Sequence, residues 1–201
     1  MIQYIWEVKI INTPFLKRKC SHCSSDRFYC SEKFRMNAQK KNIDIWLIYN
    51  CLKCGSSYNM TIFSRIKPEN IDKNLFNKFS ENCTKTAWDY AFSRETAWKN
   101  NVELDYESVR YELEYEKISA EDILNGDHDI IAFEIKYPFD FNLKFSSVIK
   151  KCLQLSTNKL NQLITEEAIH IPQGPLQKKH KIKNKDIIQI NRARLKSMYD
   201  N

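Results

Sequence analysis

Hydrophobic and polar side chains alternate along the first ten residues of the chain. The apolar positions are Ile2, Tyr4, Trp6, Val8 and Ile10, and the polar positions between them include Gln3, Glu7 and Lys9. A period of two residues is typical of a half-buried strand, because successive side chains of a strand point to opposite faces. We therefore expect a strand over residues 2–10.

Three further strand-like runs follow, at residues 28–36, 43–50 and 58–66. A polar turn over residues 37–42 separates the first two runs. We therefore expect these two runs to form a hairpin, with the third run as a neighbouring strand.

The hydrophobic period becomes helical after Pro68, a residue that suits the first turn of a helix. One apolar helical face is formed by Ile71, Leu75, Phe76 and Phe79. Asn82 is expected to cap a second helix, and Ser93 is expected to cap a short third helix that runs through Trp98.

Two alternating strands are expected after these helices. The apolar positions of the first are Val109, Tyr111, Leu113 and Tyr115, and those of the second are Ile131, Phe133, Ile135 and Tyr137. Glutamates occupy positions 112, 114 and 116 of the first strand. We interpret these carboxylates as a solvent-facing row and not as an acid–base pair, because half-buried antiparallel strands normally carry such a polar face.

The last third of the chain begins with two amphipathic helices. Their apolar faces comprise Phe145, Val148, Ile149 and Leu153 in the first helix and Leu160, Leu163 and Ile164 in the second. Ser156 is expected to cap the second helix. Short strands are expected to begin at Ile169 and at Ile187, with a turn at Gly174 between them.

Cysteine spacing indicates a metal site. Cys20 and Cys23 form one Cys-x-x-Cys pair, 27 residues intervene, and Cys51 and Cys54 form a second pair directly before Gly55. Four thiolates are a ligand set of tetrahedral structural zinc, and a pair at each end of a hairpin is the layout of a zinc ribbon. Such a closed site indicates a structural role for the metal.

Two alternatives to this ligand set stay open. The four residues could be ordinary buried cysteines, which behave as small hydrophobic side chains. Alternatively, Cys30 or His22 could replace one of the four as a ligand.

The number of cysteines favours a reducing compartment. There are seven, an odd number that includes two close pairs, which argues against a secreted disulfide framework. The first residues show no basic segment followed by a long apolar one, and no eighteen apolar residues run together. We therefore expect a cytoplasmic protein with no signal peptide and no membrane span.

Charge is segregated along the chain, whose formal net charge is +7. Residues 1–66 hold 11 basic and 4 acidic side chains, residues 67–140 hold 9 and 17, and residues 141–201 hold 12 and 4. Two basic ends around an acidic middle indicate that the ends bind a polyanion, with an ordinary solvated surface as the alternative.

The order of elements from residue 141 resembles the RNA-binding domain named for the fourth small-subunit ribosomal protein, which also occurs in pseudouridine synthases and tyrosyl-tRNA synthetases. The matching positions are Leu155, Ser156, Leu160, Leu163, Ile164, Ile169, Ile171, Gly174, Lys183, Asp186 and Ile188. The resemblance implies that basic side chains of two helices and a lysine-rich turn contact structured RNA. The residues expected to do so are Lys150, Lys151, Lys159, Lys178, Lys179, Lys181 and Lys183.

A second resemblance covers residues 30–54, which read CSEKFRMNAQKKNIDIWLIYNCLKC. This run is similar to an uncharacterised bacterial family, the domain of unknown function with the number 1062. The resemblance implies a family and no particular activity.

The expected fold class is therefore α+β, in four regions. Residues 1–66 are the zinc-ribbon region, residues 67–140 an acidic middle of helices and strands, residues 141–191 a small RNA-binding-like domain, and residues 192–201 a basic tail.

The expected function is the binding of structured RNA without catalysis. The three glycines, Gly55, Gly126 and Gly174, lie too far apart for a phosphate-binding loop, and no His-Glu-x-x-His motif is present. We therefore expect a protein that binds ribosomal or transfer RNA and contains one structural zinc ion. The alternatives are a zinc-ribbon module that binds another protein and an RNA-modifying enzyme.

Overall fold

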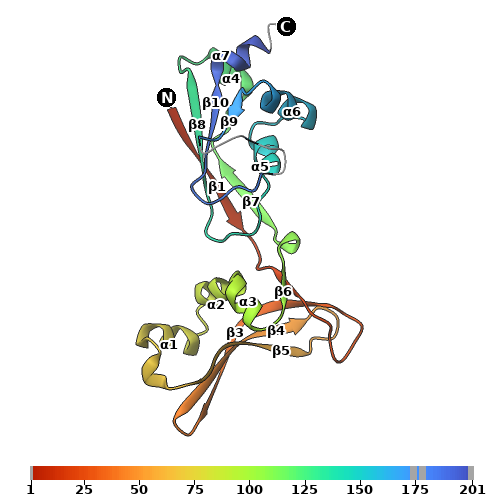
Figure 1. Cartoon of the computed structure of the whole chain (residues 1–201), viewed down its shortest axis with the longest axis vertical. Coiled ribbons are helices and arrows are strands. Elements are labelled where there is room, and N and C mark those ends of the chain that lie inside the picture. The colour runs from red at the N-terminus through yellow and green to blue at the C-terminus, as the bar shows by residue number, and fades with distance from the viewer. Residues whose placement is uncertain (1, 173–175, 177–179, 199–201) are drawn as a thin grey trace. The chain divides into compact units, whose positions relative to one another are not determined.

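The chain is divided into two compact units in its computed structural model, which describes residues 2–172, 176 and 180–198 (Figure 1). The central unit is the continuous segment Ile11–Arg110, and the terminal unit combines Met1–Ile10 with Tyr111–Asn201. Each unit contains a five-stranded sheet together with helices, so the expected α+β class is confirmed.

The sheet of the central unit has the strand order β5-β4-β3-β2-β6, and every neighbouring pair is antiparallel. The bounds are β2 Phe15–Lys17, β3 Arg27–Gln39, β4 Asn42–Cys51, β5 Ser57–Ile66 and β6 Glu103–Asp105. β3 and β4 form the expected hairpin, and β5 is the expected neighbour of β4. The period-two pattern therefore located these three strands correctly.

Three helices cover one face of this sheet, as Figure 1 shows: α1 Lys73–Ser80, α2 Thr84–Ala91 and α3 Arg94–Lys99. Single turns of 3-10 helix lie at Pro68–Asn70 (η1) and Tyr106–Ser108 (η2). The apolar side of β4 faces the helices and forms two hydrophobic clusters with them. Their fully buried members include Ile45, Leu47, Tyr49, Phe79, Ala87 and Ala91.

The start of α2 differs from the predicted one. Cys83, and not Asn82, is the N-cap residue of this helix. Asn82 has a φ of 54°, and its side-chain oxygen accepts a hydrogen bond from the backbone N–H of Phe34 at 2.7 Å. Its amide therefore ties α2 to β3 instead of capping the helix. Ser93 caps α3 as predicted, because its hydroxyl accepts from the N–H of Thr96.

A β-bulge interrupts the register of β3 and β4 between Cys30 and Phe34. Glu32, within the bulge, has a φ of 59°, and its carboxylate accepts a hydrogen bond from the indole N–H of Trp88 in α2 at 2.6 Å. A bulge re-aims a side chain, and here it directs an acidic group to the helix-covered side of the sheet.

The sheet of the terminal unit has the strand order β7-β1-β8-β10-β9. The bounds are β1 Ile2–Ile10, β7 Tyr111–Tyr115, β8 Ile130–Lys136, β9 Ile169–His170 and β10 Ile187–Asn191. β1 pairs antiparallel with β7 and parallel with β8, so that Trp6 lies opposite both Tyr115 and Ile135. The N-terminal strand therefore lies inside a sheet whose other strands all come from residues 111–191.

Four helices belong to the described part of the terminal unit: α4 Ala120–Asn125, α5 Phe145–Cys152, α6 Thr157–Thr165 and α7 Arg192–Ser197. Ser156 caps α6 as predicted. Trp6 and Phe133 stack in the core with ring centroids 4.2 Å apart, and Phe145 of α5 is fully buried. No helix among the described residues is both long enough and apolar enough to cross a bilayer.

The region predicted as a basic tail, residues 192–201, begins with a helix. Residues 192–197 form α7, which Asn191 caps through a hydrogen bond to the N–H of Arg194. Leu195 is buried, so this helix is held by an apolar contact that the short, lysine- and arginine-rich sequence does not reveal.

The boundaries of the two units differ from those of the predicted regions. Residues 1–66 contribute β1 to the terminal unit and β2 to β5 to the central unit, and residues 67–140 are likewise shared. Residues 141–191 are not separate either, because β10 pairs with β8 from Ile187 opposite Glu134 to Asn191 opposite Ile130. These segments are joined by long-range strand pairing, which changes in composition along the chain do not predict.

Candidate metal centre

The two Cys-x-x-Cys knuckles are brought together by the pairing of β3 with β4. Cys20 and Cys23 lie in the loop that joins β2 to β3, and Cys51 ends β4 with Cys54 in the turn that follows. Phe28, near the start of β3, pairs with Cys51. The backbone N–H of Leu52 also donates to the carbonyl of Arg27 at 3.1 Å. Antiparallel pairing therefore places both knuckles at one end of the sheet.

The four Sγ atoms form a compact cluster. All lie within 4.8 Å of one another, with Cys20 and Cys54 at 3.7 Å and Cys23 and Cys51 at 3.6 Å. Thiolates bound at about 2.3 Å to a tetrahedral ion lie about 3.8 Å apart, whereas a disulfide joins its sulfurs at about 2 Å. The spacing fits metal ligands, and all four cysteines are free thiols. These residues could hold a metal ion.

Hydrogen-bond donors surround the sulfurs. The backbone N–H of His22 lies 3.4 Å from the Sγ of Cys20, and that of Ser25 lies 3.5 Å from the Sγ of Cys23. The hydroxyl of Ser56 lies 3.3 Å from Cys20 and 3.1 Å from Cys54. Such groups orient metal ligands and stabilise their negative charge.

The thiols respond unequally to these donors. The pKa of Cys51 is lowered to about 6, chiefly by the backbone N–H of Cys54, and the pKa of Cys20 is lowered chiefly by the hydroxyl of Ser56. At Cys23 the N–H of Ser25 lowers the pKa, but burial and the neighbouring thiols outweigh it and raise the pKa to about 12. A cation among the sulfurs supplies the charge needed to ionise all four.

Two of the four cysteines are buried, so one side of the cluster is shielded from solvent. Cys51 is 1% exposed and Cys20 is 5% exposed, while Cys23 is half-buried and Cys54 is exposed. Four protein ligands complete a tetrahedral site and leave no position for a substrate. Geometry and donor chemistry thus fit a metal ion held by four protein ligands.

The alternative ligands lie outside the cluster. Among the described residues, the group of possible ligands at this site consists of the four cysteines alone. Cys30 is buried on β3, where burial raises the pKa of its thiol to about 12, and the side chain of His22 is exposed.

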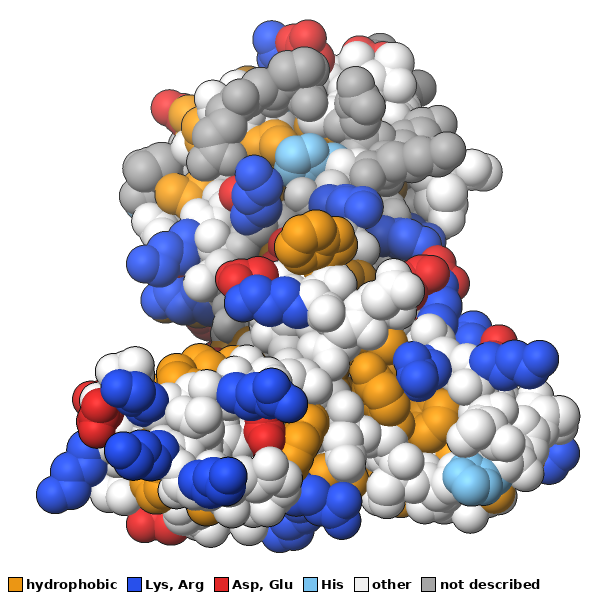
Figure 2. All heavy atoms as spheres, turned by 60° about the horizontal axis from the view of Figure 1, so that its bottom comes forward, with side chains coloured by type: hydrophobic (Ala, Val, Ile, Leu, Met, Phe, Trp, Pro, Cys, Tyr) orange, Lys and Arg blue, Asp and Glu red, His pale blue; other side chains and the backbone are white. Residues whose placement is uncertain are grey.

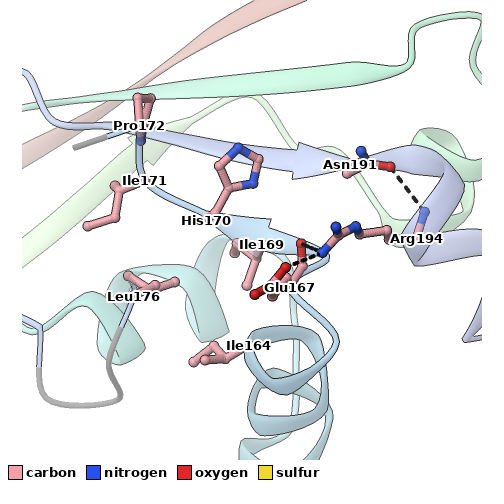
Figure 3. A pocket seen from close by; sticks show the side chains of 9 residues that line it. All are labelled: Ile164, Glu167, Ile169, His170, Ile171, Pro172, Leu176, Asn191 and Arg194. Atoms are coloured by element: carbon pink, nitrogen blue, oxygen red, sulfur yellow. Dashed lines mark hydrogen bonds and ion pairs between the residues drawn. The ribbon is translucent and has the colours of Figure 1, made fainter. Parts of the chain in front are cut away.

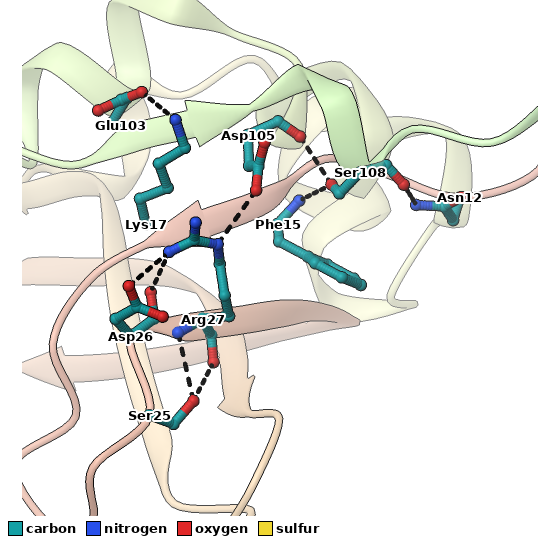
Figure 4. A network of polar contacts seen from close by, with 9 residues as sticks. All are labelled: Asn12, Phe15, Lys17, Ser25, Asp26, Arg27, Glu103, Asp105 and Ser108. Atoms are coloured by element: carbon teal, nitrogen blue, oxygen red, sulfur yellow. Dashed lines mark hydrogen bonds and ion pairs between the residues drawn. The ribbon is translucent and has the colours of Figure 1, made fainter.

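A polar network holds the strands beside the first knuckle (Figure 4). Arg27, at the start of β3, donates from Nε to Asp105 of β6 at 3.0 Å, and Lys17 of β2 forms an ion pair with Glu103 of β6. The hydroxyl of Ser108 also accepts from the backbone N–H of Phe15 at 2.9 Å. These contacts hold β2 in place, and the first knuckle lies in the loop that follows β2.

The turn of the second knuckle requires a left-handed residue. Gly55 has a φ of +72°, and its N–H donates to the carbonyl of Cys51 at 3.0 Å. A Cβ at this position would meet nothing within 4 Å, so a substitution acts through the backbone alone.

Gly55→Val is therefore expected to destabilise the central unit by about 1–2 kcal/mol, because a branched side chain is strained at positive φ. Gly55→Asn is the matched control, since asparagine tolerates this conformation. Thermal unfolding and the metal content of both variants are the measurements. Equal stability of the two variants would contradict the role assigned to the turn.

The predicted RNA-contacting lysines lie in the terminal unit where they are described. Lys150 and Lys151 occupy the last turn of α5, Lys159 lies in α6, and Lys181 and Lys183 precede β10, whereas Lys178 and Lys179 lie outside the described residues. A backbone bridge joins Lys181 to Lys144, and the N–H of Phe145 donates to the carbonyl of His180 at 3.0 Å. The segment before β10 thus lies beside the start of α5.

A pocket of about 580 Å³ in the terminal unit was not predicted (Figure 3). Isoleucines 164, 169 and 171 line it together with His170 and Arg194. Arg194 forms an ion pair with Glu167 at 2.6 Å, and His170 lies 3.0 Å from the side-chain oxygen of Gln189. No sequence pattern indicates this pocket, because Arg194 and the residues of β9 are distant in the chain and only the fold brings α7 to β9.

Fold and site together define an α+β protein with a four-cysteine cluster that could hold a metal ion. The chain belongs to the family described as Protein of unknown function (DUF1062), whose model matches residues 36–174, and the resemblance inferred from residues 30–54 is confirmed. The matched range begins within β3, contains Cys51 and Cys54, and ends before β10. No curated protein and no solved structure matches the chain.

Proposed function

We propose that this chain is a non-catalytic protein that binds structured RNA, such as ribosomal or transfer RNA, and whose central unit is a zinc ribbon. Cys20, Cys23, Cys51 and Cys54 hold the zinc. Four soft thiolates favour zinc over hard cations, and the separation of the sulfurs fits a tetrahedral ion. With seven free thiols, the protein would act in the cytoplasm, where cysteines stay reduced.

The observation that carries the RNA proposal is the contact between the lysine-bearing segment before β10 and the start of α5. Lys181 and Lys183 are exposed on that segment, and Lys151 is exposed at the other end of α5. Lys181 donates to the neutral side chain of Asn142 at 3.1 Å. Among the described residues, no ion pair joins Lys151, Lys181 or Lys183 to an acidic side chain. Such cations are available to phosphate groups, which supports contact with an RNA backbone along this surface.

A second candidate function is binding to another protein. Trp98 of α3 is 81% exposed, and tryptophan is enriched among residues that dominate protein interfaces. The two functions differ in their response to salt, because counterion release is specific to a polyanionic partner.

Replacing Lys151, Lys181 and Lys183 together by glutamine is expected to weaken binding of a hairpin RNA and to flatten its salt dependence. Each lost phosphate contact lowers the log–log slope of affinity against salt by about 0.7–0.9, so the triple variant should lose roughly two units. The melting temperature should change little, since exposed lysines contribute little to stability.

The matched control replaces Lys85 and Lys99 by glutamine, because each is an exposed lysine paired with an acidic residue one helical turn away. Binding and slope should stay as in the wild type. Wild-type protein without salt-dependent affinity for hairpin RNA would overturn the RNA proposal and leave protein binding in its place.

A further inference from the structure

The sheet of the central unit has a second face, opposite the helices. Along β4 the buried residues Ile45, Leu47 and Tyr49 alternate with Trp46 and Ile48, which are half-buried and belong to neither hydrophobic cluster of this unit. Since alternate side chains point to opposite sides, Trp46 and Ile48 lie on the face away from α1, α2 and α3. We call this side the open face.

The strand register defines the other side chains of the open face. Trp46 lies between Arg35 of β3 and Thr61 of β5, and Asn50 lies between Tyr29 and Ser57 in the same way. Ile48 pairs with Asn59 between these two rows. The open face is thus a shallow surface of aromatic, amide and hydroxyl groups, with Tyr29 40% exposed at one end.

Basic residues surround the aromatic ones. Residues 27–66 hold seven basic side chains and two acidic ones. Those close to the open face or to the hairpin tip are Lys33, Arg35, Lys40, Lys41 and Arg65. Within the part of the chain that the structure describes, no ion pair involves any of these five. Figure 2 shows Lys and Arg side chains spread over the lower part of the view, with hydrophobic atoms exposed between them.

One of the two acidic side chains of this segment is turned to the helix-covered side, and the other, Asp44, lies on the open-face side of β4 near the hairpin tip. Glu32 accepts the indole N–H of Trp88 on the helix-covered side, because the bulge turns it there. Asp44 accepts the backbone N–H of Arg65 at 2.8 Å near the tip of the hairpin. Within the described part of the chain, neither carboxylate forms an ion pair with Lys33 or Arg35, so both basic groups are available to phosphate groups.

Two aromatic residues of the open face are separated along the direction of the strands. Tyr29 and Trp46 lie in rows four residues apart on β4, which is roughly 13 Å along a strand. Exposed aromatic rings interleaved with basic residues stack bases and hold the phosphate backbone of a single strand. A duplex does not fit this chemistry, since its bases are already stacked on one another.

We propose that the open face binds a single-stranded segment of nucleic acid, with bases stacked on Trp46 and Tyr29 and phosphates held by Lys33 and Arg35. This inference rests on the proposed RNA-binding function and adds a second contact of a different kind. The C-terminal lysines contact the backbone of folded RNA, while the open face takes an unpaired stretch. Stacking tolerates any base, so little sequence preference is expected.

The test is binding of a fluorescein-labelled twelve-nucleotide oligouridylate to the full-length protein, followed by anisotropy. Trp46→Ala should bind roughly ten-fold more weakly, and Trp46→Phe should bind nearly as well as the wild type, because a ring remains for stacking. Trp98→Ala is the matched control, an exposed tryptophan on a helix of the covered side, and should leave affinity unchanged.

A second pair of variants avoids any effect on packing. Lys33 and Arg35 are exposed, so Lys33→Gln and Arg35→Gln should preserve the fold and the metal content. Each should lower the salt slope for the oligouridylate by about 0.7, the value for a single-strand phosphate contact. Unchanged slopes in both variants would overturn the inference even if Trp46→Ala proved unstable.

The outcomes separate this inference from the proposed function. Wild-type protein that binds hairpin RNA but not the oligouridylate overturns the open-face inference and leaves the proposed function intact. Binding of the oligouridylate with the losses expected at Trp46 and Arg35, but no binding of hairpin RNA, supports the open face and overturns recognition of structured RNA. A dimer in sedimentation that Trp46→Ala dissociates, without nucleic-acid binding, makes a second copy the occupant and overturns the inference.

Discussion

Cys51→Ser is expected to release the bound metal and to unfold the central unit. The hydroxyl of serine is a poor ligand for a soft site, and Cys51 is the last residue of β4, which pairs with β3 beside the first knuckle. Metal binding by four thiolates contributes on the order of 10 kcal/mol to the folding of small zinc modules, which is comparable to the whole stability of a domain. The loss should therefore be large.

The measurements are elemental analysis and hydrogen exchange of the purified protein. Wild type should contain one zinc per chain, and in Cys51→Ser the amides of residues 11–110 should exchange freely while those of β8 and β10 stay protected. Cys83→Ser is the matched control, because Cys83 lies outside the cluster and serine is a good residue at the N-cap position that it occupies. The metal proposal would be contradicted if native protein contained no zinc, or if Cys51→Ser retained all of its metal.

Deletion of residues 1–10 is expected to unfold the terminal unit. β1 is hydrogen-bonded to β7 on one side and β8 on the other, so its removal splits the sheet and exposes two strand edges. It also removes Trp6, which is fully buried and stacked on Phe133. Trp6→Ala alone should reduce the stability of this unit by about 3–5 kcal/mol.

Ile5→Ala is the matched control for Trp6→Ala, because Ile5 is the adjacent residue of the same strand and is 49% exposed. Its effect on the melting temperature should be small. The central unit should keep its metal and its hydrogen-exchange protection in the deletion variant. A terminal unit that remained protected without residues 1–10 would refute the central position of β1 in its sheet.

Local features of this fold could be predicted from the sequence because they depend on near neighbours. The alternation at Trp6 and Val8 located β1, and serines 93 and 156 marked the starts of α3 and α6. The cysteine cluster was found from spacing, since each Cys-x-x-Cys pair already sets two sulfurs close together.

Features that depend on distant pairing could not be predicted. Nothing in the alternation of β1 says that its neighbours are β7 and β8, or that its pairing with β8 is parallel. Asn82 has the side chain of a helix cap, but the sequence does not show that this side chain accepts the N–H of Phe34, on another strand. Which side of the hairpin stays open could not be predicted for a similar reason, since Trp46 and Tyr49 look alike until the helices cover one side of β4.

The central unit is inserted in the chain between β1 and β7, so its folding affects how the sheet of the terminal unit assembles during synthesis. β1 is synthesised before all of its partners, none of which exists until residue 111 has been added. Folding of the central unit brings its ends together, as the bond from the N–H of Ile11 to the carbonyl of Arg110 at 2.9 Å shows. Without it, pairing β1 with β7 would close a flexible loop of about 100 residues, at an entropic cost of about 4 kcal/mol. If the central unit folds only with its metal, as proposed, metal binding would also favour the pairing of β1 with β7 in the other unit.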